Sequence, residues 1–413
     1  MKSLKITDLR VAVVTRAPMT CPLIRIDTNQ EGLYGLGEVR DGASNTYALM
    51  LKSRLLNENP LDVDRLFRKI KQFGHHARQA GGVCAVEMAL WDIVGKYHGV
   101  PVYQLLGGKF RDSLRIYADT DLDPDPAVAG RRLKKRMDEG YTFLKMDFMG
   151  FDSGKNVIEA LYGTVQLPSH LSPREVLRTQ HMFTGIELTE AEIARIVEYI
   201  AEVRRTIGTE IPLAADHFGH FGVNSLIRLG KALEPFHLAW LEDLIPWQHT
   251  DLWRRITEAV PLPTCTGEDI YLKDGFLELC RNHAVDIIHP DLATSGGIME
   301  TKKIGDIAQE FGIPMAMHFA GTPVSFMANV HCAAATENFL VLEHHSVDVP
   351  WWEDLVEGID KPMVRNGFMQ VPDTPGLGIT LNEDVVREHL LDGRFFEPTP
   401  EWNDERSADR LFS

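Results

Sequence analysis

Several ionisable residues recur at regular intervals in the second half of the sequence, each where a short apolar run ends. They are Asp216, Glu242, Glu268, Asp291, His318 and Glu343. The interval is about 25 residues, the length of one strand–helix unit in a barrel, and residues at the carboxyl ends of barrel strands point to one mouth. We therefore expect these side chains to meet in a single pocket.

Three of these residues, Asp216, Glu242 and Glu268, are carboxylates on consecutive predicted strands. Carboxylates held close together without a counter-charge raise one another's pKa. A hard cation removes this conflict, and a ligand set made only of oxygen suits Mg²⁺. Mg²⁺ would polarise a substrate carboxylate and stabilise the enolate left when an α-proton departs. Helix N-caps are the other interpretation of such acids, but the matching register on three strands favours a metal site.

The next two strand ends supply an acid–base pair. Asp291 could hold the His318 imidazole, fix its tautomer and raise its basicity, which would make His318 a general acid or base. Glu343, on the last of these strands, could donate a hydrogen bond to a substrate carboxylate if a crowded anionic site keeps it protonated.

Lys145 and Asp147 are two residues apart on an earlier predicted strand, so both side chains can face inward. Lys145 could contact the substrate carboxylate or the oxygens bound to the metal. Three roles stay open for Asp147: a base, a ligand of a substrate hydroxyl, or the salt-bridge partner of Lys145.

Histidines near these strands are harder to assign. On a strand, His217 would point away from Asp216, whereas His220 could fold back over the mouth and touch the substrate. The pairs His75-His76 and His344-His345 are typical of solvated or lid residues.

Short apolar strands and amphipathic helices alternate in the part of the chain that must position these residues. The strand-like runs lie at 114–118, 142–146, 211–215, 238–241, 263–266, 286–289, 314–317 and 339–342. Helical patterns fill the intervals, for example at 126–139, 190–206 and 299–311. Repeated strand–helix units predict a parallel sheet, and this number of units predicts a closed α/β barrel. An open doubly wound sheet is the structural alternative.

Two further regions frame the predicted barrel. Residues 4–28 and 33–39 are typical of a small antiparallel sheet, and a helix is expected at 84–98, where Gly99 ends it. An insert of about 40 residues, 148–187, separates two of the barrel strands and carries Tyr162. It would lie over the active-site face or form a dimer contact.

Composition excludes several classes of function. The net charge of −16 argues against a nucleic-acid or anionic-membrane partner, and no apolar run reaches the roughly 18 residues of a membrane span. The N-terminus has no signal-peptide pattern. The five cysteines are scattered without metal-type spacing, which predicts reduced thiols and a cytoplasmic location.

Two motifs resemble the enolase superfamily, in its mandelate racemase-like branch. One is Ala85-Val-Glu-Met-Ala-Leu-Trp-Asp-Ile93 with Tyr103-Gln-Leu-Leu-Gly-Gly108, and the other is the series Asp216, Trp240-Leu-Glu242-Asp, Gly267-Glu268-Asp, His289-Pro-Asp291 and His318. The resemblance implies a (β/α)7β TIM-type barrel over 114–350 and an α+β capping domain over 1–113, to which the tail 351–413 returns. It also implies Mg²⁺ on Asp216, Glu242 and Glu268, a His318–Asp291 dyad, and cap loops that close over the substrate near Thr20 and Leu23.

Within this branch, the long insert and the position of Glu343 look similar to mannonate and other acid-sugar dehydratases. The usual Lys-x-Lys of the family is Lys145-Met-Asp147 here, and the Asp-x-His of mannonate-type enzymes has Phe218 in place of its histidine. The base is therefore open between His318, Asp147 and Tyr162.

The leading hypothesis is a Mg²⁺-dependent hydro-lyase that dehydrates a sugar acid, an aldonate or aldarate, to a 2-keto-3-deoxy acid. A racemase, epimerase or cycloisomerase that uses the same enolate is the second hypothesis, and a non-catalytic sugar-acid binder is the third. Proteins of this type often form homo-oligomers, and we expect one here.

Overall fold

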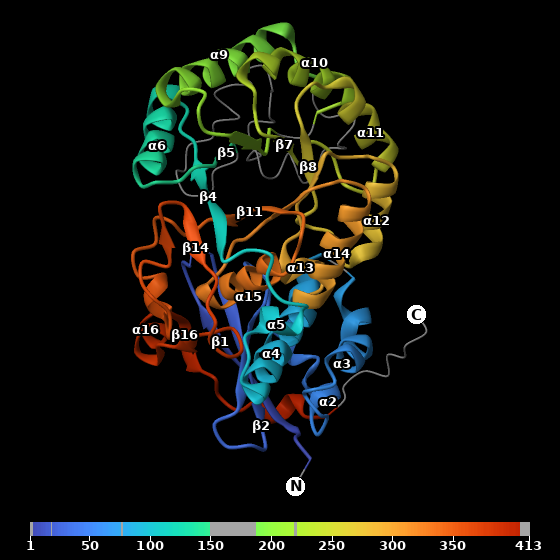
Figure 1. Cartoon of the computed structure of the whole chain (residues 1–413), viewed down its shortest axis with the longest axis vertical. Helices are drawn as coiled ribbons and strands as arrows, with labels where there is room; N and C mark the ends of the chain where they lie inside the picture. The colour runs from blue at the N-terminus through green and yellow to red at the C-terminus, as the bar shows by residue number, and fades with distance from the viewer. Residues whose placement is uncertain (1–2, 18, 76, 149–186, 219–220, 405–413) are drawn as a thin grey trace, which may run out of the picture.

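The computed structural model describes residues 3–404 except 18, 76, 149–186 and 219–220. Tyr162 and His220, both predicted to be in the site, lie outside the described residues. A barrel of parallel strands fills one half of the molecule, and the N-terminal segment, drawn in blue in Figure 1, lies below it.

The barrel closes as predicted. Its strands pair in sequence order, and the last pairs with the first in parallel. They are β4 (Ser113–Asp121), β5 (Leu144–Asp147), β6 (Leu213–Asp216), β7 (Leu241–Glu242), β8 (Thr264–Thr266), β9 (Ile287–Ile288), β10 (Met315–Met317) and β11 (Phe339–His344). This closure confirms the (β/α)7β barrel and excludes the open doubly wound sheet.

Helices follow the strands and form the outer wall of the barrel (Figure 1). They are α6 (Pro126–Asp138), α9 (Glu190–Ile207), α10 (Val223–Leu233), α11 (Thr250–Ala259), α12 (Lys273–Arg281), α13 (Leu292–Ser295), α14 (Ile298–Glu310) and α15 (Pro323–Ala334). Local sequence fixes several starts: Asp125 caps α6, and Thr189 with Glu192 forms a capping box at α9. In the described part of the chain, no helix is long and apolar enough to cross a membrane.

The N-terminal region forms an antiparallel sheet of order β16-β1-β2-β3. Its strands are β1 (Ile6–Val14), β2 (Cys21–Thr28), β3 (Tyr34–Glu38) and, from the end of the chain, β16 (Leu390–Phe395). Helix α4 (Ala80–His98) packs closely on β3. The glycines Gly35 and Gly37 allow this approach, because a Cβ at either position would lie within 2.0 Å of a backbone oxygen of α4. We call this sheet, with α4 and the short helices around it, the cap.

Shorter elements complete the cap and the C-terminal tail. They are α1 (Thr46–Leu49), α2 (Lys52–Leu55), α3 (Val63–Ile70), α5 (Val102–Leu105), β12 (Val356–Glu357), β13 (Val364–Arg365), β14 (Phe368–Gln370), β15 (Thr380–Leu381) and α16 (Glu383–Glu388). Strand β14 pairs with β4, so the tail contacts the barrel before β16 joins the cap.

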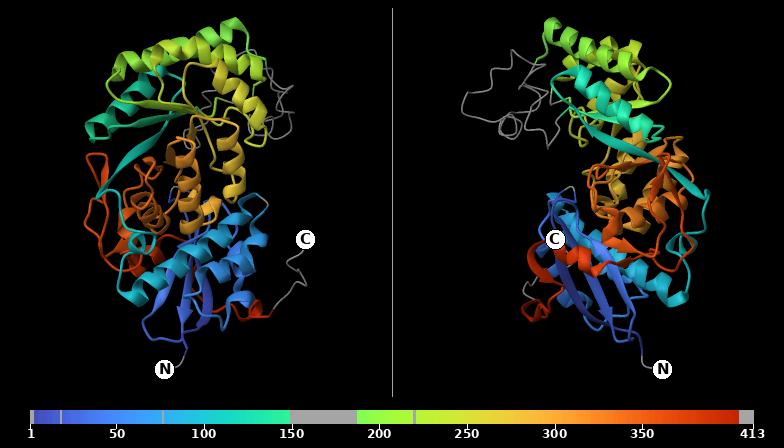
Figure 2. Two further views of the ribbon diagram at one scale, coloured as in Figure 1. Left: turned by 45° about the vertical axis from the view of Figure 1, so that its right-hand side comes forward. Right: turned by 90° about the vertical axis from the view of Figure 1, so that its left-hand side faces the viewer.

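The cap lies directly against the barrel (Figure 2), and two of its carboxyl groups contact barrel helices. Glu87 of α4 accepts hydrogen bonds from the backbone N–H groups of Ile298 and Met299 at the start of α14, at 2.6 and 2.9 Å. Glu38 of β3 accepts from the N–H of Thr322 at the start of α15, at 2.9 Å. The first N–H groups of a helix have no acceptor within the helix, so these carboxyl groups satisfy them and fix the cap against the barrel.

Candidate active site

Two successive layers of side chains fill the barrel. The lower layer is a buried cluster to which each strand contributes one residue. In two cases, Phe143 and Trp240, this residue lies directly before the strand. The cluster consists of Tyr117, Phe143, Ala214, Trp240, Cys265, Ile287, Ala316 and Val341. Because side chains alternate along a strand, the residues two positions further on face the same interior. Those residues are Asp119, Lys145, Asp216, Glu242, Gly267, His289, His318 and Glu343. An apolar floor therefore lies beneath a ring of ionisable groups.

Strand β8 breaks this pattern. Gly267 has a φ of +147°, and a Cβ there would lie 2.7 Å from Phe276 and 3.1 Å from the His289 backbone. A side chain has no room at this point of the ring. The next residue, Glu268, supplies the carboxylate instead and reaches His318, with its Oε2 3.1 Å from His318 Nε2.

Lys145 lies at the centre of the ring and is 1% exposed. Its Nζ is 2.6 Å from Glu343 Oε1, 3.0 Å from Asp216 Oδ2 and 3.5 Å from Glu242 Oε1. Burial alone would lower the pKa of Lys145, but Asp216 and Glu242 raise it well above its usual value. Lys145 is therefore a fixed ammonium among the predicted metal ligands.

The three predicted metal ligands are each paired with a cation. Lys145 contacts Asp216 and Glu242, and the guanidinium of Arg40 contacts Glu268 Oε1 at 3.4 Å. Burial and the nearby charge of Glu242 raise the pKa of Asp216 to about 6.

The neighbouring Asp243 shows that the three acids share one region. Burial raises the pKa of Asp243 well above its usual value, and so do the charges of Glu268, Asp216 and Glu242. The charges of the three predicted ligands therefore act together on Asp243, in addition to its burial.

Glu242 is oriented from inside the barrel. Its Oε1 lies 2.8 Å from His289 Nδ1, and its Oε2 accepts a hydrogen bond of 2.7 Å from Trp240 Nε1. Burial raises the pKa of Glu242, but His289 and Lys145 outweigh it and lower that pKa to about 2. His289 also lies 2.9 Å from the Tyr117 hydroxyl. Sequence reasoning missed His289, although the two-residue alternation along β9 places it in the ring.

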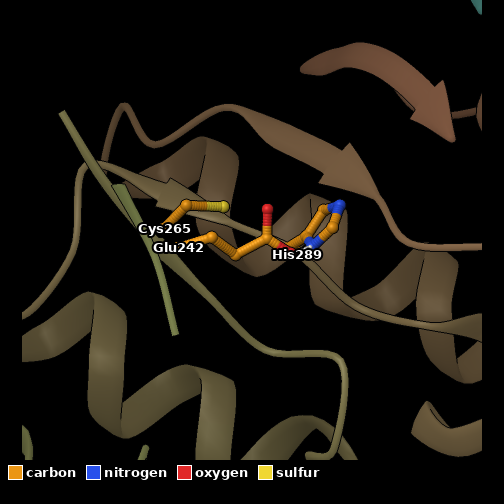
Figure 3. Close-up of side chains that lie close together, drawn as sticks. All are labelled: Glu242, Cys265 and His289. Atoms are coloured by element: carbon orange, nitrogen blue, oxygen red, sulfur yellow. Dashed lines mark ion pairs between the residues drawn. The ribbon is translucent and has the colours of Figure 1, made fainter. Parts of the chain in front are cut away.

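Within the described residues, two groups bring possible ligand atoms within 4.8 Å of one another. One is Glu242, Cys265 and His289, and the other is His318, Glu343 and His345. Neither group is the predicted set Asp216, Glu242 and Glu268. Figure 3 shows the first group, with the Glu242 carboxylate between the Cys265 thiol and the His289 imidazole. Because His289 already contacts both Glu242 and Tyr117, we interpret this group as the support of Glu242.

His318 and Asp291 lie together as predicted: His318 Nδ1 is 2.6 Å from Asp291 Oδ2. The other oxygen of Asp291 accepts a hydrogen bond of 2.7 Å from the N–H of Ala293. His318 is therefore held through one ring nitrogen, and its Nε2 faces Glu268.

Glu343 lies between two cations. Lys145 is 2.6 Å away, and His345 Nε2 is 3.3 Å from the same oxygen, Oε1. Burial raises the pKa of Glu343, but Lys145, His318 and His345 outweigh it and lower that pKa well below its usual value. These neighbours favour the ionised carboxylate over the protonated donor expected from the sequence.

His217 was wrongly expected to point away from Asp216. Its φ of +54° turns the chain at the end of β6, so the imidazole returns to the mouth. His217 Nδ1 lies 3.1 Å from Asp147 Oδ1 and 3.4 Å from Asp216 Oδ2. Burial lowers the pKa of His217, but Asp216 and Asp147 outweigh it and raise that pKa well above its usual value.

His345 is a second histidine that the sequence analysis did not place in the site. It lies after β11, with Nδ1 3.3 Å from Asp119 Oδ2, and its ring centroid is 5.6 Å from that of His318. Burial lowers the pKa of His345, but Asp119 and Glu343 raise it to about 10. The mouth therefore contains three histidine–aspartate pairs.

A cavity of about 680 Å³ opens beside the ring, between the cap and the loops after β7 and β8. Its lining includes His75, Arg78, Asp243, Gln248, Asp269 and Tyr271. The predicted cap contacts lie elsewhere: Leu23 is 1% exposed in the hydrophobic core, and the carbonyl of Thr20 accepts a hydrogen bond from the N–H of Gly42. Contact of either residue with substrate stays a prediction.

Comparison with known proteins agrees with this architecture. Residues 2–107 match the N-terminal domain of mandelate racemase / muconate lactonizing enzyme, and residues 129–385 match the enolase C-terminal domain-like family. D-xylonate dehydratase of Haloferax volcanii is 34% identical over 402 residues, which cover 95% of this chain and 90% of the relative. Arabinonate dehydratase of Saccharolobus solfataricus is 27% identical over 398 residues, which cover 92% and 93%.

Solved structures give the same result. A mandelate racemase/muconate lactonizing enzyme-like protein from Rubrobacter xylanophilus superimposes with a TM-score of 0.82 at 30% identity, covering 96% of this chain and 100% of that one. A mandelate racemase/muconate lactonizing enzyme from Jannaschia sp. CCS1 gives 0.78 at 29% identity, covering 95% and 99%. The chain therefore belongs to the mandelate racemase-like branch of the enolase superfamily.

Proposed function

We propose that this protein is a Mg²⁺-dependent dehydratase that converts a sugar acid to a 2-keto-3-deoxy acid. One observation carries the proposal: a buried lysine, three carboxylates and histidine–aspartate pairs converge on one barrel mouth beside a cavity. The relatives named as dehydratases of xylonate and arabinonate support this reaction class.

The residues present fit a hard cation. Asp216, Glu242 and Glu268 would hold it, because their donor atoms are all oxygen, as Mg²⁺ prefers. Asp216 is buried, and the charge of Glu242 adds to burial in raising its pKa; a divalent ion between them would relieve this repulsion. When bound, Mg²⁺ would supply positive charge to the substrate carboxylate and to the charge that develops on it.

The protein's own groups divide the remaining work. Lys145 would bind the substrate carboxylate, since its ammonium is already held among the ligands. Strands β6 and β10 are four positions apart in the closed ring of strands. His217 and His318, which follow them, are therefore on opposite sides of the mouth.

The position of His217 and His318 on opposite sides of the mouth favours a separate role for each. His217, paired with Asp147, would take the α-proton when its imidazole is neutral, a form that the charges of Asp216 and Asp147 disfavour while no cation is bound. His318, oriented by Asp291, would give a proton to the departing 3-hydroxyl. Proton and hydroxyl would then leave from opposite faces of the substrate.

The same opposition also favours a second candidate, epimerisation, because that reaction needs a base on each face. Both candidates are tested together by incubating the protein with Mg²⁺ and a panel of aldonic and aldaric acids in D₂O. A 2-keto product supports dehydration. Incorporation of deuterium at the α-carbon with inversion and no keto product supports epimerisation. A full panel with neither result contradicts both.

A further inference from the structure

Arg40 is a residue of the cap that reaches into the barrel site. It follows β3 and is 2% exposed. Its Nη1 lies 2.5 Å from Asp291 Oδ2 and donates a hydrogen bond of 3.1 Å to Thr294 Oγ1. Its Nη2 lies 3.4 Å from Glu268 Oε1. One side chain therefore contacts the acid of the His318–Asp291 dyad and a predicted metal ligand.

Asp291 depends on this contact. Its Oδ2 is shared between Arg40 Nη1 at 2.5 Å and His318 Nδ1 at 2.6 Å, and its Oδ1 is held by the N–H of Ala293. Among the described residues, His318 and the N–H of Ala293 would remain to hold the carboxylate without Arg40. A buried carboxylate that loses a cation reorients or takes up a proton, because an unpaired buried charge is costly.

The guanidinium is itself fixed from the cap side. Asp41 Oδ1 lies 2.8 Å from Arg40 Nε, and Arg78 Nη1 lies 3.2 Å from the same Asp41 oxygen. The planar fork of arginine can contact two acceptors in fixed directions, which the single ammonium of lysine cannot do. Arg40 therefore transmits the position of the cap to Asp291 and Glu268 together.

We propose that Arg40 is a positioning residue through which docking of the cap assembles the His318–Asp291 dyad. The inference rests on the proposed dehydration, in which His318 protonates the leaving hydroxyl. It goes beyond that proposal because it makes the chemistry of the barrel depend on an arginine that lies outside the barrel.

Arg40→Met and Arg40→Lys test the inference. We expect Arg40→Met to lower kcat for keto-acid formation about 100-fold, the usual contribution of a positioned acid, and to change KM less than about 3-fold. Exchange of the substrate α-proton in D₂O should fall less than kcat, because Arg40 contacts Glu268 and Asp291 but, in the described contacts, not His217. Arg40→Lys should recover only part of kcat, since it cannot contact Asp291 and Glu268 in the same fork.

Arg54→Met is the matched control. Arg54 is also a buried arginine of the cap, but it lies over the Phe73 ring and donates to the Met50 carbonyl. The inference is overturned if Arg40→Met keeps the kcat of the wild type. It is also overturned if both variants lose kcat in proportion to their melting temperatures, because the role would then be general stability.

Two further measurements keep the outcomes separate. Thr294→Val removes one acceptor of Arg40 and should lower kcat in the same direction by a smaller factor, which covers the case in which Arg40→Met does not fold. Crystal structures of the wild type and Arg40→Met need no substrate: a preserved contact between Asp291 and His318 in the variant overturns the inference. If the wild type dehydrates no acid, the proposed function fails, and these structures still decide the role of Arg40.

Discussion

His217 Nδ1 lies 3.1 Å from Asp147 Oδ1, across the mouth from the contact of 2.6 Å between His318 Nδ1 and Asp291 Oδ2. A histidine held by an aspartate has a fixed ring orientation and an assigned proton position. A substrate between the two pairs would meet one imidazole on each face. At the two positions where the resemblance implies a lysine and a histidine base, this sequence has Asp147 and Phe218.

Replacing each histidine should therefore stop a different step. His217→Asn should lower both α-proton exchange and keto-acid formation about 100-fold or more, because the proposed base of that face is lost. His318→Asn should lower keto-acid formation similarly and leave the exchange in place. Proton NMR of the substrate in D₂O with Mg²⁺ measures both steps in one experiment.

His237→Asn is the control for this pair of variants. His237 also has a positive φ, of 47°, but it is an exposed residue before β7, at the other end of the barrel. Its replacement should change neither step. If His318→Asn stops the exchange and His217→Asn does not, the two roles are reversed.

Lys145 should contribute most to the stability of the folded protein when no metal is bound. Its ammonium contacts Asp216, Glu242 and Glu343, so Lys145→Met leaves the buried carboxylates of Asp216 and Glu343 without their nearest cation. We expect the free energy of unfolding in EDTA to fall by about 3–5 kcal/mol relative to the wild type. Mg²⁺ should reduce this difference, since it supplies the missing positive charge.

Denaturant unfolding of both proteins, with EDTA and with Mg²⁺, measures the effect. The prediction fails if Lys145→Met loses the same stability in both conditions, because Mg²⁺ would then not share the site of the lysine.

Much of this site could be predicted because the alternation of side chains along a strand can be read from a few neighbouring residues. Once the apolar runs are placed, the ends of β6, β7 and β10 give Asp216, Glu242 and His318, and the barrel closes as expected. The same alternation would also have given His289, which follows β9.

The residues that were missed depend on features that strand periodicity does not contain. His217 enters the mouth through a left-handed backbone turn, and His345 follows the last barrel strand in a loop. Arg40 comes from the cap, and its contacts with Glu268 and Asp291 join residues more than 200 positions apart in the chain. Such contacts depend on how the cap packs against the barrel.

His289 should affect the affinity for metal more than Cys265 does. His289 Nδ1 holds Glu242 Oε1 at 2.8 Å, and loss of such an orienting contact lowers metal affinity about 10–100-fold. His289→Asn should therefore weaken Mg²⁺ binding measured by calorimetry. Cys265→Ser should leave it unchanged, because burial raises the pKa of the Cys265 thiol well above its usual value and keeps it neutral.

A zinc site at Glu242, Cys265 and His289 would give a different result with the same variants. If Glu242, Cys265 and His289 form a zinc site instead, the purified wild type should contain zinc and Cys265→Ser should lose it. Metal analysis of both proteins distinguishes this result from the Mg²⁺ site.

Acidification should destabilise the protein partly through His331 of α15. This side chain is fully buried, its ring stacks on Tyr103 at 5.9 Å, and burial lowers its pKa from 6.5 to about 4. The unfolded chain binds a proton near pH 6.5, whereas the folded protein does not until about pH 4. Stability is therefore fully present above pH 6.5 and is lost as the pH falls towards 4. The loss between pH 7.5 and 5 should be about 2 kcal/mol from this residue.

His331→Gln removes this titration and should lose about 2 kcal/mol less than the wild type over the same interval. Urea unfolding at pH 7.5 and pH 5 measures the difference, and the exposed His98→Gln serves as the control. His344, whose pKa burial lowers to about 3, remains in both proteins, so some acid sensitivity should persist in the variant. Equal losses in the wild type and His331→Gln would mean that the folded protein admits a proton to His331 as readily as the unfolded chain does.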